Sequence, residues 1–282
     1  NEKVVNFYEQ LMISKIYQMN QKEKFDIIHI HPYRRCIPFA PLTKTKTVIT
    51  IHDPIVGFNK YQLASTKKIP QIFLISLSAS QRKPLPDLNY AATIYNGLDL
   101  KKYKFNEKLK DFFVAAGRLV PEKGIDLAIL AAKKAKVKLK IAGGPAEGEY
   151  FEKKIKPYLN ENIEYVGMID YFKMGDFYSQ AKGILYPHRW EEPFGLIFIE
   201  SMACGTPVIA LDRGSAREVI KDGKTGFVVK DLEEMVRAIK KIDRISRRDC
   251  RAWVEKNFTI EKMVENYEKV FYQILFRSQK IQ

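Results

Sequence analysis

The chain has 282 residues, 46% of them hydrophobic, which is enough for one large or two ordinary domains with sizeable cores. Its 48 Lys and Arg against 33 Asp and Glu give a net charge of +15, which favours an anionic partner: a phosphorylated substrate, nucleic acid or an anionic membrane surface. Three cysteines without CxxC spacing argue against a disulfide framework or a zinc site, and no apolar run comes near the length of a membrane-spanning helix, about twenty residues. We therefore expect a globular cytoplasmic protein with no bound metal, whose membrane contact, where it has any, is peripheral.

The first hundred residues are predicted to form a parallel α/β layer. Apolar residues in Val4–Met19 recur close to the helical period, which indicates a helix. Short apolar runs separated by helices or Pro-rich connectors are typical of strands in a parallel sheet. Four such strands are predicted: Phe25–His31, Thr47–His52, Gln71–Ser78 and Ala91–Tyr95.

A polar segment that begins at Asn96-Gly97 indicates a turn and a linker to a second domain. Beyond it, strands and helices alternate, which predicts a doubly wound parallel sheet. The predicted strands are Phe112–Gly117, Leu139–Ala142, Ile163–Gly167, Gly183–Tyr186, Pro207–Leu211 and Gly226–Val229, and the predicted helices are Pro121–Ala135, Glu147–Leu159, Phe172–Ala181, Leu196–Ala203, Leu232–Ile242, Ser246–Asn257 and Ile260–Phe276. We place the two domains at residues 1–100 and 101–258, followed by a final helical segment at 259–282.

The stretch Tyr186–Leu211, YPHRWEEPFGLIFIESMACGTPVIAL, concentrates functional residue types. Gly195 is expected to open a helix, and the unpaired amides of such a helix start, here at Phe194, Gly195 and Leu196, bind anions. Glu192 and Glu200 lie eight positions apart, one just before this helix and one inside it. A sugar nucleotide needs this combination, because amides bind its diphosphate and carboxylates accept hydrogen bonds from its hydroxyls.

The segment EPFGLIFIE followed by MACGTPVIA closely resembles the signature of retaining GT-B glycosyltransferases, the large family that includes glycogen synthases and sucrose-phosphate synthases. The segments DIIHIH, TIHD, ISLSASQRKPLP and YNGLDLKKY resemble, in that order, the back half of this family's N-terminal domain. The resemblance implies an α/β protein of GT-B architecture, with two Rossmann-like doubly wound domains that face a cleft. It also implies that the first domain lacks its opening strand and glycine-rich loop, and that the last helix crosses back onto that domain.

Further residues join the expected site. Arg118 and Lys123 follow the second domain's first strand, where ligands of open α/β sheets bind, and in the resemblance they hold the donor's phosphates without a metal. Gly143 permits close approach of a nucleotide, and Met168 lies in the region where family members seat the base. His52 ends a strand in Ile-His-Asp and is expected to contact the donor sugar or the acceptor. We expect Glu192, His52, Arg118 and Lys123 to carry catalysis, and Arg118, Lys123, Gly143, Met168, Phe194, Gly195, Leu196 and Glu200 to bind the donor.

The sequence leaves three functions open. A retaining, metal-independent glycosyltransferase would move a hexosyl group from a UDP-, GDP- or ADP-sugar, its donor substrate, to a hydroxyl acceptor such as a sugar, a lipid-linked sugar or a glycan. A non-catalytic or regulatory fragment of such an enzyme would only bind the nucleotide sugar. A nucleic-acid or lipid-surface binder would rely on the net charge, but the basic residues are scattered and no aromatic-basic recognition pattern accompanies them, so we expect no nucleic-acid partner.

Overall fold

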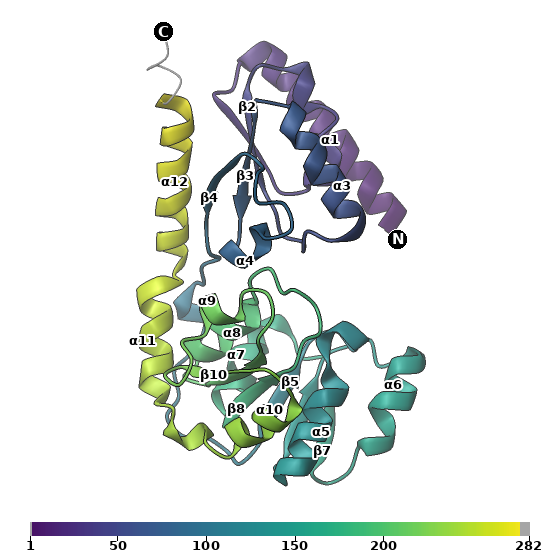
Figure 1. Cartoon of the computed structure of the whole chain (residues 1–282), viewed down its shortest axis with the longest axis vertical. Coiled ribbons are helices and arrows are strands. Elements are labelled where there is room, and N and C mark those ends of the chain that lie inside the picture. Colours follow the sequence, from purple (N-terminus) through teal and green to yellow (C-terminus); the bar gives the residue numbers. More distant parts are fainter. Residues whose placement is uncertain (1, 277–282) are drawn as a thin grey trace. The chain divides into compact units, whose positions relative to one another are not determined.

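The computed structural model describes residues 2–276 and divides the chain into two compact units. In Figure 1 the first is drawn from purple to blue together with the yellow helix α12, and the second from teal to yellow-green. The first unit holds the chain up to Tyr95 together with the chain from Met263 on, and the second holds Asn96–Lys262. Residues 277–282 of the expected final segment lie outside the described residues. Each unit is built on its own parallel sheet.

The first unit contains a four-stranded sheet in the order β1-β2-β3-β4, and all its neighbouring strands are parallel. The strands are β1 (Ile27–Ile30), β2 (Lys46–Thr50), β3 (Ile72–Ser76) and β4 (Tyr90–Thr93), each within two residues of its predicted bounds. The helices are α1 (Glu2–Glu23), α2 (Tyr33–Cys36), α3 (Gly57–Ser65), α4 (Ala79–Arg82) and most of α12 (Ile260–Phe276).

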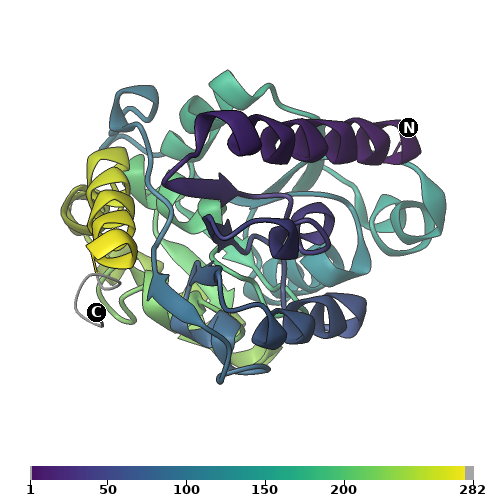
Figure 2. The same cartoon turned by 90° about the horizontal axis from the view of Figure 1, so that it is seen from above.

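Side chains of this sheet alternate between its two faces, and each face has its own apolar cluster. On one face, buried strand residues such as Ile28 and Ile49 pack with Ile13 of α1 and Leu63 of α3. On the other face, Val48 and Ile75 pack with Val270 and Ile274 of α12. Figure 2 shows α12, in yellow, on the opposite side of the sheet from α3. The C-terminal helix therefore completes the core of the first unit.

The second unit contains a six-stranded parallel sheet in the order β10-β9-β8-β5-β6-β7. The strands are β5 (Phe113–Ala116), β6 (Leu139–Ala142), β7 (Ile163–Gly167), β8 (Gly183–Tyr186), β9 (Val208–Leu211) and β10 (Gly226–Val229). The helices are α5 (Ile125–Ala135), α6 (Gly148–Lys154), α7 (Tyr171–Ser179), α8 (Leu196–Ala203), α9 (Ala216–Val219), α10 (Leu232–Ile239) and α11 (Arg247–Asn257). Helix α5 packs beside α10, and α8 packs beside α11 and α7, so that both faces are covered as in a doubly wound fold (Figure 1).

Several predicted helices are shorter in the structure than the sequence indicated, and for two of them a single Gly or Pro is the cause. The helix predicted over Pro121–Ala135 is interrupted at Gly124, whose φ of +69° is left-handed, so that Pro121–Lys123 forms a separate 3₁₀ turn before α5. The helix predicted over Glu147–Leu159 ends at Lys154, because Pro157 has no amide to donate to the preceding turn. The first interruption matters for function, since it places Lys123 on a loop.

None of the helices described between residues 2 and 276 combines the length and the apolar character needed to cross a bilayer. Cys36, Cys204 and Cys250 are free and buried, and burial raises the pKa of each thiol to about 12. These cysteines therefore behave as small core residues.

Candidate functional site

The sheet of the second unit reverses its winding direction between β5 and β8. The chain goes outward from β5 through β6 to β7, and then returns to β8 on the other side of β5 before it continues to β9 and β10. Ligands of open α/β sheets bind at such a reversal, in the crevice beyond the carboxyl ends of the two strands. The loops that leave these ends are residues 117–124 after β5 and 187–195 after β8, which carry Lys123 and Glu192.

The two loops are held against each other along their backbones. The Arg189 amide donates to the Glu122 carbonyl oxygen at 2.7 Å. A Cβ atom added at Gly124 would lie 2.0 Å from the Pro187 carbonyl oxygen, so only glycine permits this approach. Because of the contact, the side chains of the two loops share one small region.

A clamp of three side chains reinforces this contact. The Arg189 guanidinium donates to both carboxylate oxygens of Asp126, at 2.8 and 2.7 Å, and to the Pro121 carbonyl oxygen at 2.7 Å. The Tyr150 hydroxyl donates to Asp126 at 2.7 Å. Burial acts to raise the pKa of the Asp126 carboxyl, but the hydrogen bonds from Arg189 and Tyr150 outweigh it and the net pKa is lowered. We call Asp126, Tyr150 and Arg189 the loop clamp.

Glu192 is the centre of the region that the two loops enclose. Its Oε2 atom lies 3.2 Å from Lys123 Nζ, 2.7 Å from the Tyr186 hydroxyl and 2.9 Å from Trp190 Nε1. Lys123 Nζ also lies 2.6 Å from the Tyr186 hydroxyl and 4.3 Å from the centre of the Trp190 ring. Burial first, and the Glu192 charge second, hold the pKa of Tyr186 well above its usual range, so this hydroxyl stays protonated. We call Lys123, Tyr186, Trp190 and Glu192 the Glu192 cluster.

Glu200, the other predicted carboxylate, has different partners. It lies on α8, near the hydroxyls of Tyr103 and Tyr178. Burial raises the pKa of Glu200, and the two tyrosine hydroxyls oppose the rise. The structure thus brings Lys123 and Glu192 into contact and gives Glu200 a different set of neighbours.

The amino end of α8 is open, as the sequence predicted. Gly195 is the N-cap, with φ +79° and no capping side chain, and an added Cβ there would lie 2.4 Å from the Phe198 ring. Phe194 is buried, its carbonyl oxygen accepting a 2.7 Å hydrogen bond from the Ser215 hydroxyl, whereas Leu196 is 46% exposed. Backbone donors therefore begin directly after the loop that holds Glu192.

Gly143 and Met168 lie at the carboxyl ends of the next two strands. An added Cβ at Gly143, where φ is +139°, would lie 1.8 Å from the Gly117 carbonyl oxygen. Met168 is 79% exposed and lies against Gly144, whose added Cβ would be 2.8 Å from Met168 Cγ. Because these glycines have no side chain, the loops after β5 and β6 can pack closely against each other, and Met168 lies exposed beside them.

Arg118 is exposed in the loop after β5 and makes no ion pair or hydrogen bond with any residue between 2 and 276. Its charge acts on Tyr186, where it lowers the pKa against the larger effect of burial. A guanidinium without a partner at this end of the sheet is available to an anion. Within the described part of the chain, no group of three His, Cys, Asp or Glu side chains is arranged to hold a metal ion.

His52 belongs to the first unit and follows the carboxyl end of β2. Its Nε2 lies 2.7 Å from Nδ1 of His31, and the two rings stack at 5.0 Å. Burial lowers the pKa of both rings, which favours their neutral forms, and in that pairing one ring donates an N–H to the other. A pocket of 180 Å³ opens beside His31 and the ion pair between Arg34 and Asp53.

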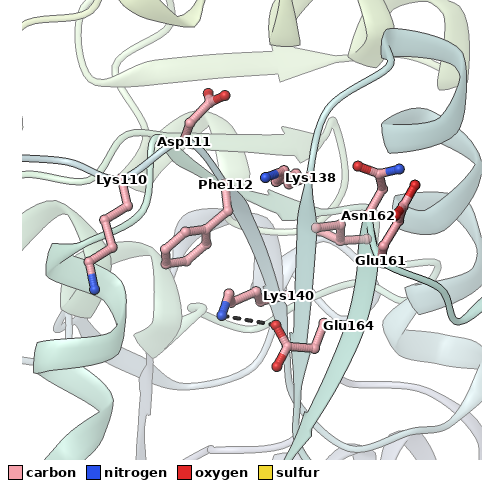
Figure 3. Close-up of a pocket in the computed structure, with 9 residues that line it drawn as sticks. Lys110, Asp111, Phe112, Lys138, Lys140, Glu161, Asn162 and Glu164 are labelled. Carbon is pink, nitrogen blue, oxygen red and sulfur yellow. Dashed lines mark ion pairs between the residues drawn. The ribbon is translucent and has the colours of Figure 1, made fainter.

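A further pocket lies at the other end of the second unit's sheet. It has a volume of 240 Å³ and is lined from the amino ends of β5, β6 and β7, by residues that include Phe112, Lys138 and Asn162 (Figure 3). Lys140 and Glu164, which also line it, form an ion pair at 2.9 Å, drawn as a dashed line in Figure 3. It is lined by none of the predicted site residues, which lie at the carboxyl ends of the strands.

Sequence reasoning missed four residues that shape the site: Asp126, Tyr186, Arg189 and Trp190. All four hold the loop before α8 or the carboxylate within it. Tyr186, Arg189 and Trp190 could have drawn attention only because they lie in the stretch Tyr186–Glu192. Asp126 lies 63 positions before its partner Arg189, so no local signal marks it.

Comparisons with known proteins show the family of this chain and its fold. A family model described as Glycosyl transferases group 1 matches residues 99–257. The uncharacterized glycosyltransferase MJ1178 of Methanocaldococcus jannaschii is 28% identical over 288 residues, which cover 90% of this chain and 77% of that protein.

Two solved structures have the same fold. Sucrose-phosphate synthase from Thermosynechococcus elongatus has a TM-score of 0.76 at 22% identity, covering 93% of this chain and 77% of that one. Anabaena Alr3699/HepE in complex with UDP has a TM-score of 0.79 at 17% identity, covering 93% and 82%. The predicted GT-B fold of two Rossmann-like units is confirmed. Because the family model spans more than half of its length, this chain belongs to the group 1 glycosyl transferases.

Proposed function

We propose that this glycosyltransferase is a retaining, metal-independent enzyme that moves a hexosyl group from a nucleoside diphosphate sugar to a hydroxyl acceptor. The observation that carries the proposal is the contact between Lys123 and Glu192 at the reversal of the sheet, directly before the open end of α8. A cation, a carboxylate and the first amides of a helix, brought together at the carboxyl ends of β5 and β8, suit the diphosphate and the hydroxyls of a nucleotide sugar. The solved relative in complex with UDP supports a nucleotide donor.

In this proposal the phosphates bind to Arg118, Lys123 and the first amides of α8. When the bond between the anomeric carbon and the β-phosphate oxygen breaks, its electron pair goes to the phosphate, where the fixed cations stabilise the growing charge. The acceptor oxygen attacks the same face of the sugar and its proton passes to the departing phosphate. Such a reaction uses no protein nucleophile.

The remaining roles concern the sugar and the base. Glu192 accepts hydrogen bonds from sugar hydroxyls, and Glu200 accepts those of the ribose in place of its tyrosine neighbours. Gly143 and Met168 receive the base, and His52 contacts the sugar or the acceptor. The donor substrate is a UDP-, GDP- or ADP-sugar, and the proposed reaction uses no cofactor besides it.

The acceptor is a hydroxyl of a sugar, a lipid-linked sugar or a glycan. We place the reaction in the cytoplasm, in keeping with three free, buried cysteines. With a lipid-linked acceptor, the net charge of +15 would hold the enzyme at an anionic membrane surface.

The test is a thermal-shift panel with UDP-, GDP- and ADP-sugars, followed by a transfer assay with the donor that binds. A donor that binds only the folded state raises the melting temperature. Glu192→Gln should abolish transfer and keep the part of the donor affinity that the diphosphate supplies, whereas Arg118→Ala should weaken both transfer and diphosphate binding. If no donor shifts the melting temperature, the proposal is wrong, and binding without transfer by the wild type would instead favour a non-catalytic binding protein.

A further inference from the structure

We propose that Tyr186 and Trp190 are positioning residues for Glu192, which saturate one of its carboxylate oxygens so that the other, Oε1, is presented to a hydroxyl of the donor sugar. This inference rests on the proposed function and adds two residues to it. Neither residue follows from the Glu-x7-Glu spacing.

The direction of every hydrogen bond in the cluster is fixed by chemistry. The Lys123 ammonium can only donate, so the Tyr186 oxygen accepts from it at 2.6 Å. The Tyr186 hydroxyl then donates its own hydrogen bond to Glu192 Oε2, at 2.7 Å. Its raised pKa keeps the proton on the tyrosine. The Trp190 indole N–H is also a donor only, and it reaches the same oxygen at 2.9 Å.

Glu192 Oε2 therefore receives three donors, from Tyr186, Lys123 and Trp190. Glu192 Oε1 accepts no hydrogen bond from any residue between 2 and 276. Glu192 is 8% exposed, and its Oε1 is not one of the fully buried polar atoms that lack a partner, so this oxygen reaches the surface and is open to a ligand. A carboxylate oxygen accepts hydrogen bonds from neutral hydroxyl groups, and sugars supply such hydroxyls.

The aromatic rings also restrain the cation. Lys123 Nζ lies 4.3 Å from the centre of the Trp190 ring and 5.3 Å from that of Tyr186. Two of its three N–H groups are used by Tyr186 and Glu192, which leaves one for a phosphate oxygen. The aromatic rings, which Phe would preserve, thus restrain Lys123, whereas the O–H and N–H donors act on Glu192.

The experiment compares Tyr186→Phe and Trp190→Phe, which remove one donor each and keep an aromatic ring. Isothermal titration measures the affinity for a nucleoside diphosphate and for the matching nucleotide sugar. A positioning role predicts that the affinity for the diphosphate stays within about twofold of the wild-type value. The ratio of the nucleotide-sugar affinity to the diphosphate affinity should fall by about 10- to 100-fold, the effect of one hydrogen bond to a charged group. The value of kcat/KM should fall by the same factor.

Deoxy-sugar donors separate positioning from general damage. The wild type should lose most with one deoxygenated donor, the one that lacks the hydroxyl bound by Oε1. With that donor, Tyr186→Phe should cause little further loss, because two changes to one interaction are not additive. Tyr17→Phe is the matched control: it removes the hydroxyl of another buried tyrosine, hydrogen-bonded to Thr47 in the first unit, and should leave the ratio unchanged.

The inference is overturned if both variants keep the wild-type ratio and rate, or if their affinity for the diphosphate falls as much as that for the nucleotide sugar. If Tyr186→Phe does not fold, Trp190→Phe alone decides between these outcomes. A wild type that binds no nucleotide sugar would overturn the proposed function instead, and the inference with it.

Discussion

Gly195 adopts a left-handed φ of +79° where the loop after β8 turns into α8. Its added Cβ would meet the Phe198 ring at 2.4 Å, and that ring is fully buried beneath the loop. Any side chain at this position would therefore strain the backbone and push the loop that carries Glu192. The backbone of this residue, more than its chemistry, determines where the first amides of α8 lie.

Replacing Gly195 by Ala should destabilise the fold by about 2–4 kcal/mol, the sum of a left-handed backbone and an overpacked contact. Gly223 is a matched control, since its φ is +72° and nothing lies within 4 Å of an added Cβ. Gly223→Ala should cost only the backbone part, about 1–2 kcal/mol. Urea denaturation measures both, and equal losses would mean that the Phe198 contact is unimportant.

The loop clamp allows a second prediction at this scale. Asp126→Asn keeps the size of the side chain but removes the charge that Arg189 binds with two hydrogen bonds. The pair is partly exposed, at 36% and 20% for the two side chains, so the loss of stability should be only about 0.5–1 kcal/mol. The loss of donor affinity should be larger, because the loop positions Glu192. A variant with lower stability and wild-type donor affinity would contradict a role of the clamp in the site.

Sequence patterns predicted the residues whose chemistry is local and missed those whose partners are distant. Gly195 before an apolar run, Glu192 and Glu200 at their spacing, and Arg118 and Lys123 after a strand could all be found by inspection. Tyr186 and Trp190 could not, because an aromatic residue at a strand end is usually a core residue until its hydroxyl or N–H is seen to reach a carboxylate.

Among the helices, α11 contributes Arg247, whose side chain joins segments that are far apart in the sequence. Its guanidinium donates to the carbonyl oxygens of Asn106, Ser179 and Ala181 at 2.7–2.8 Å, and to the Thr206 hydroxyl at 2.9 Å. Burial lowers the pKa of Arg247, and no carboxylate offsets it. The residue thus ties the linker after the first unit to the ends of α7 and α8.

Arg247→Met should destabilise the second unit by about 3 kcal/mol, because it leaves several partly buried carbonyl groups without donors. Its neighbour Arg248 is a control on the same helix: its ion pair with Glu107 is exposed, so Arg248→Met should produce no measurable change. Chemical denaturation of both variants is the measurement. If the two behave alike, Arg247 is not a structural tie.

Three histidines, His29 in β1, His31 directly after it and His52 after β2, give the first unit a pH dependence. Burial first, and the charges of His31 and His52 second, lower the pKa of His29 from 6.5 to about 4. Above about pH 6.5 the ring is neutral in both states, whereas between about pH 6.5 and 4 the unfolded chain binds a proton that the folded one does not. Stability is therefore lost as the pH falls through this window.

His29→Gln should remove part of that loss, since Gln does not titrate and can still reach Thr50, which His29 contacts at 2.9 Å. The urea midpoint of the wild type should fall between pH 7 and pH 5 by more than that of the variant. Identical pH dependence in the two proteins would show that His29 is not the group responsible.

Element types were predictable because period and punctuation agree with the final fold. The strands are short and rich in β-branched residues, and buried on both faces they appear as continuous apolar runs. The four-residue helices α2, α4 and α9 were not predicted, since a single turn leaves no periodic pattern. Helix α4, for example, is capped only by a local hydrogen bond from the Gln81 amide to the Ser78 hydroxyl. The predicted helix boundaries were wrong where a single residue ends or interrupts the helix, as Gly124 and Pro157 do.

For the whole molecule, the fold was accessible because the motif around Glu192 belongs to a specific architecture. Composition and periodicity alone predict only two parallel α/β layers. The order β10-β9-β8-β5-β6-β7, which puts the loops after β5 and β8 next to each other, depends on long-range pairing that no local pattern encodes. That order is what turns Lys123 and Glu192, sixty-nine positions apart, into neighbours.

The net charge of +15 makes opposite predictions for folding and for binding. Raising the ionic strength from about 0.01 to about 0.1 M shortens the screening length from about 30 to about 10 Å, which weakens repulsion among the excess cations and should raise the melting temperature. The same change should weaken donor binding, because Arg118 and Lys123 attract a diphosphate. With about two phosphate charges involved, log K should fall with log salt at a slope no steeper than about −2.

A nucleic acid that contacted about six phosphates would give a slope near −5. Titrating a nucleotide sugar and a duplex oligonucleotide over the same salt series therefore distinguishes a localised diphosphate site from a diffuse basic surface. The scattered distribution of basic residues predicts the shallow slope for the donor and no binding of the duplex at physiological salt. Tight, steeply salt-dependent binding of the duplex would mean that the net charge serves a polyanionic partner and not a single diphosphate.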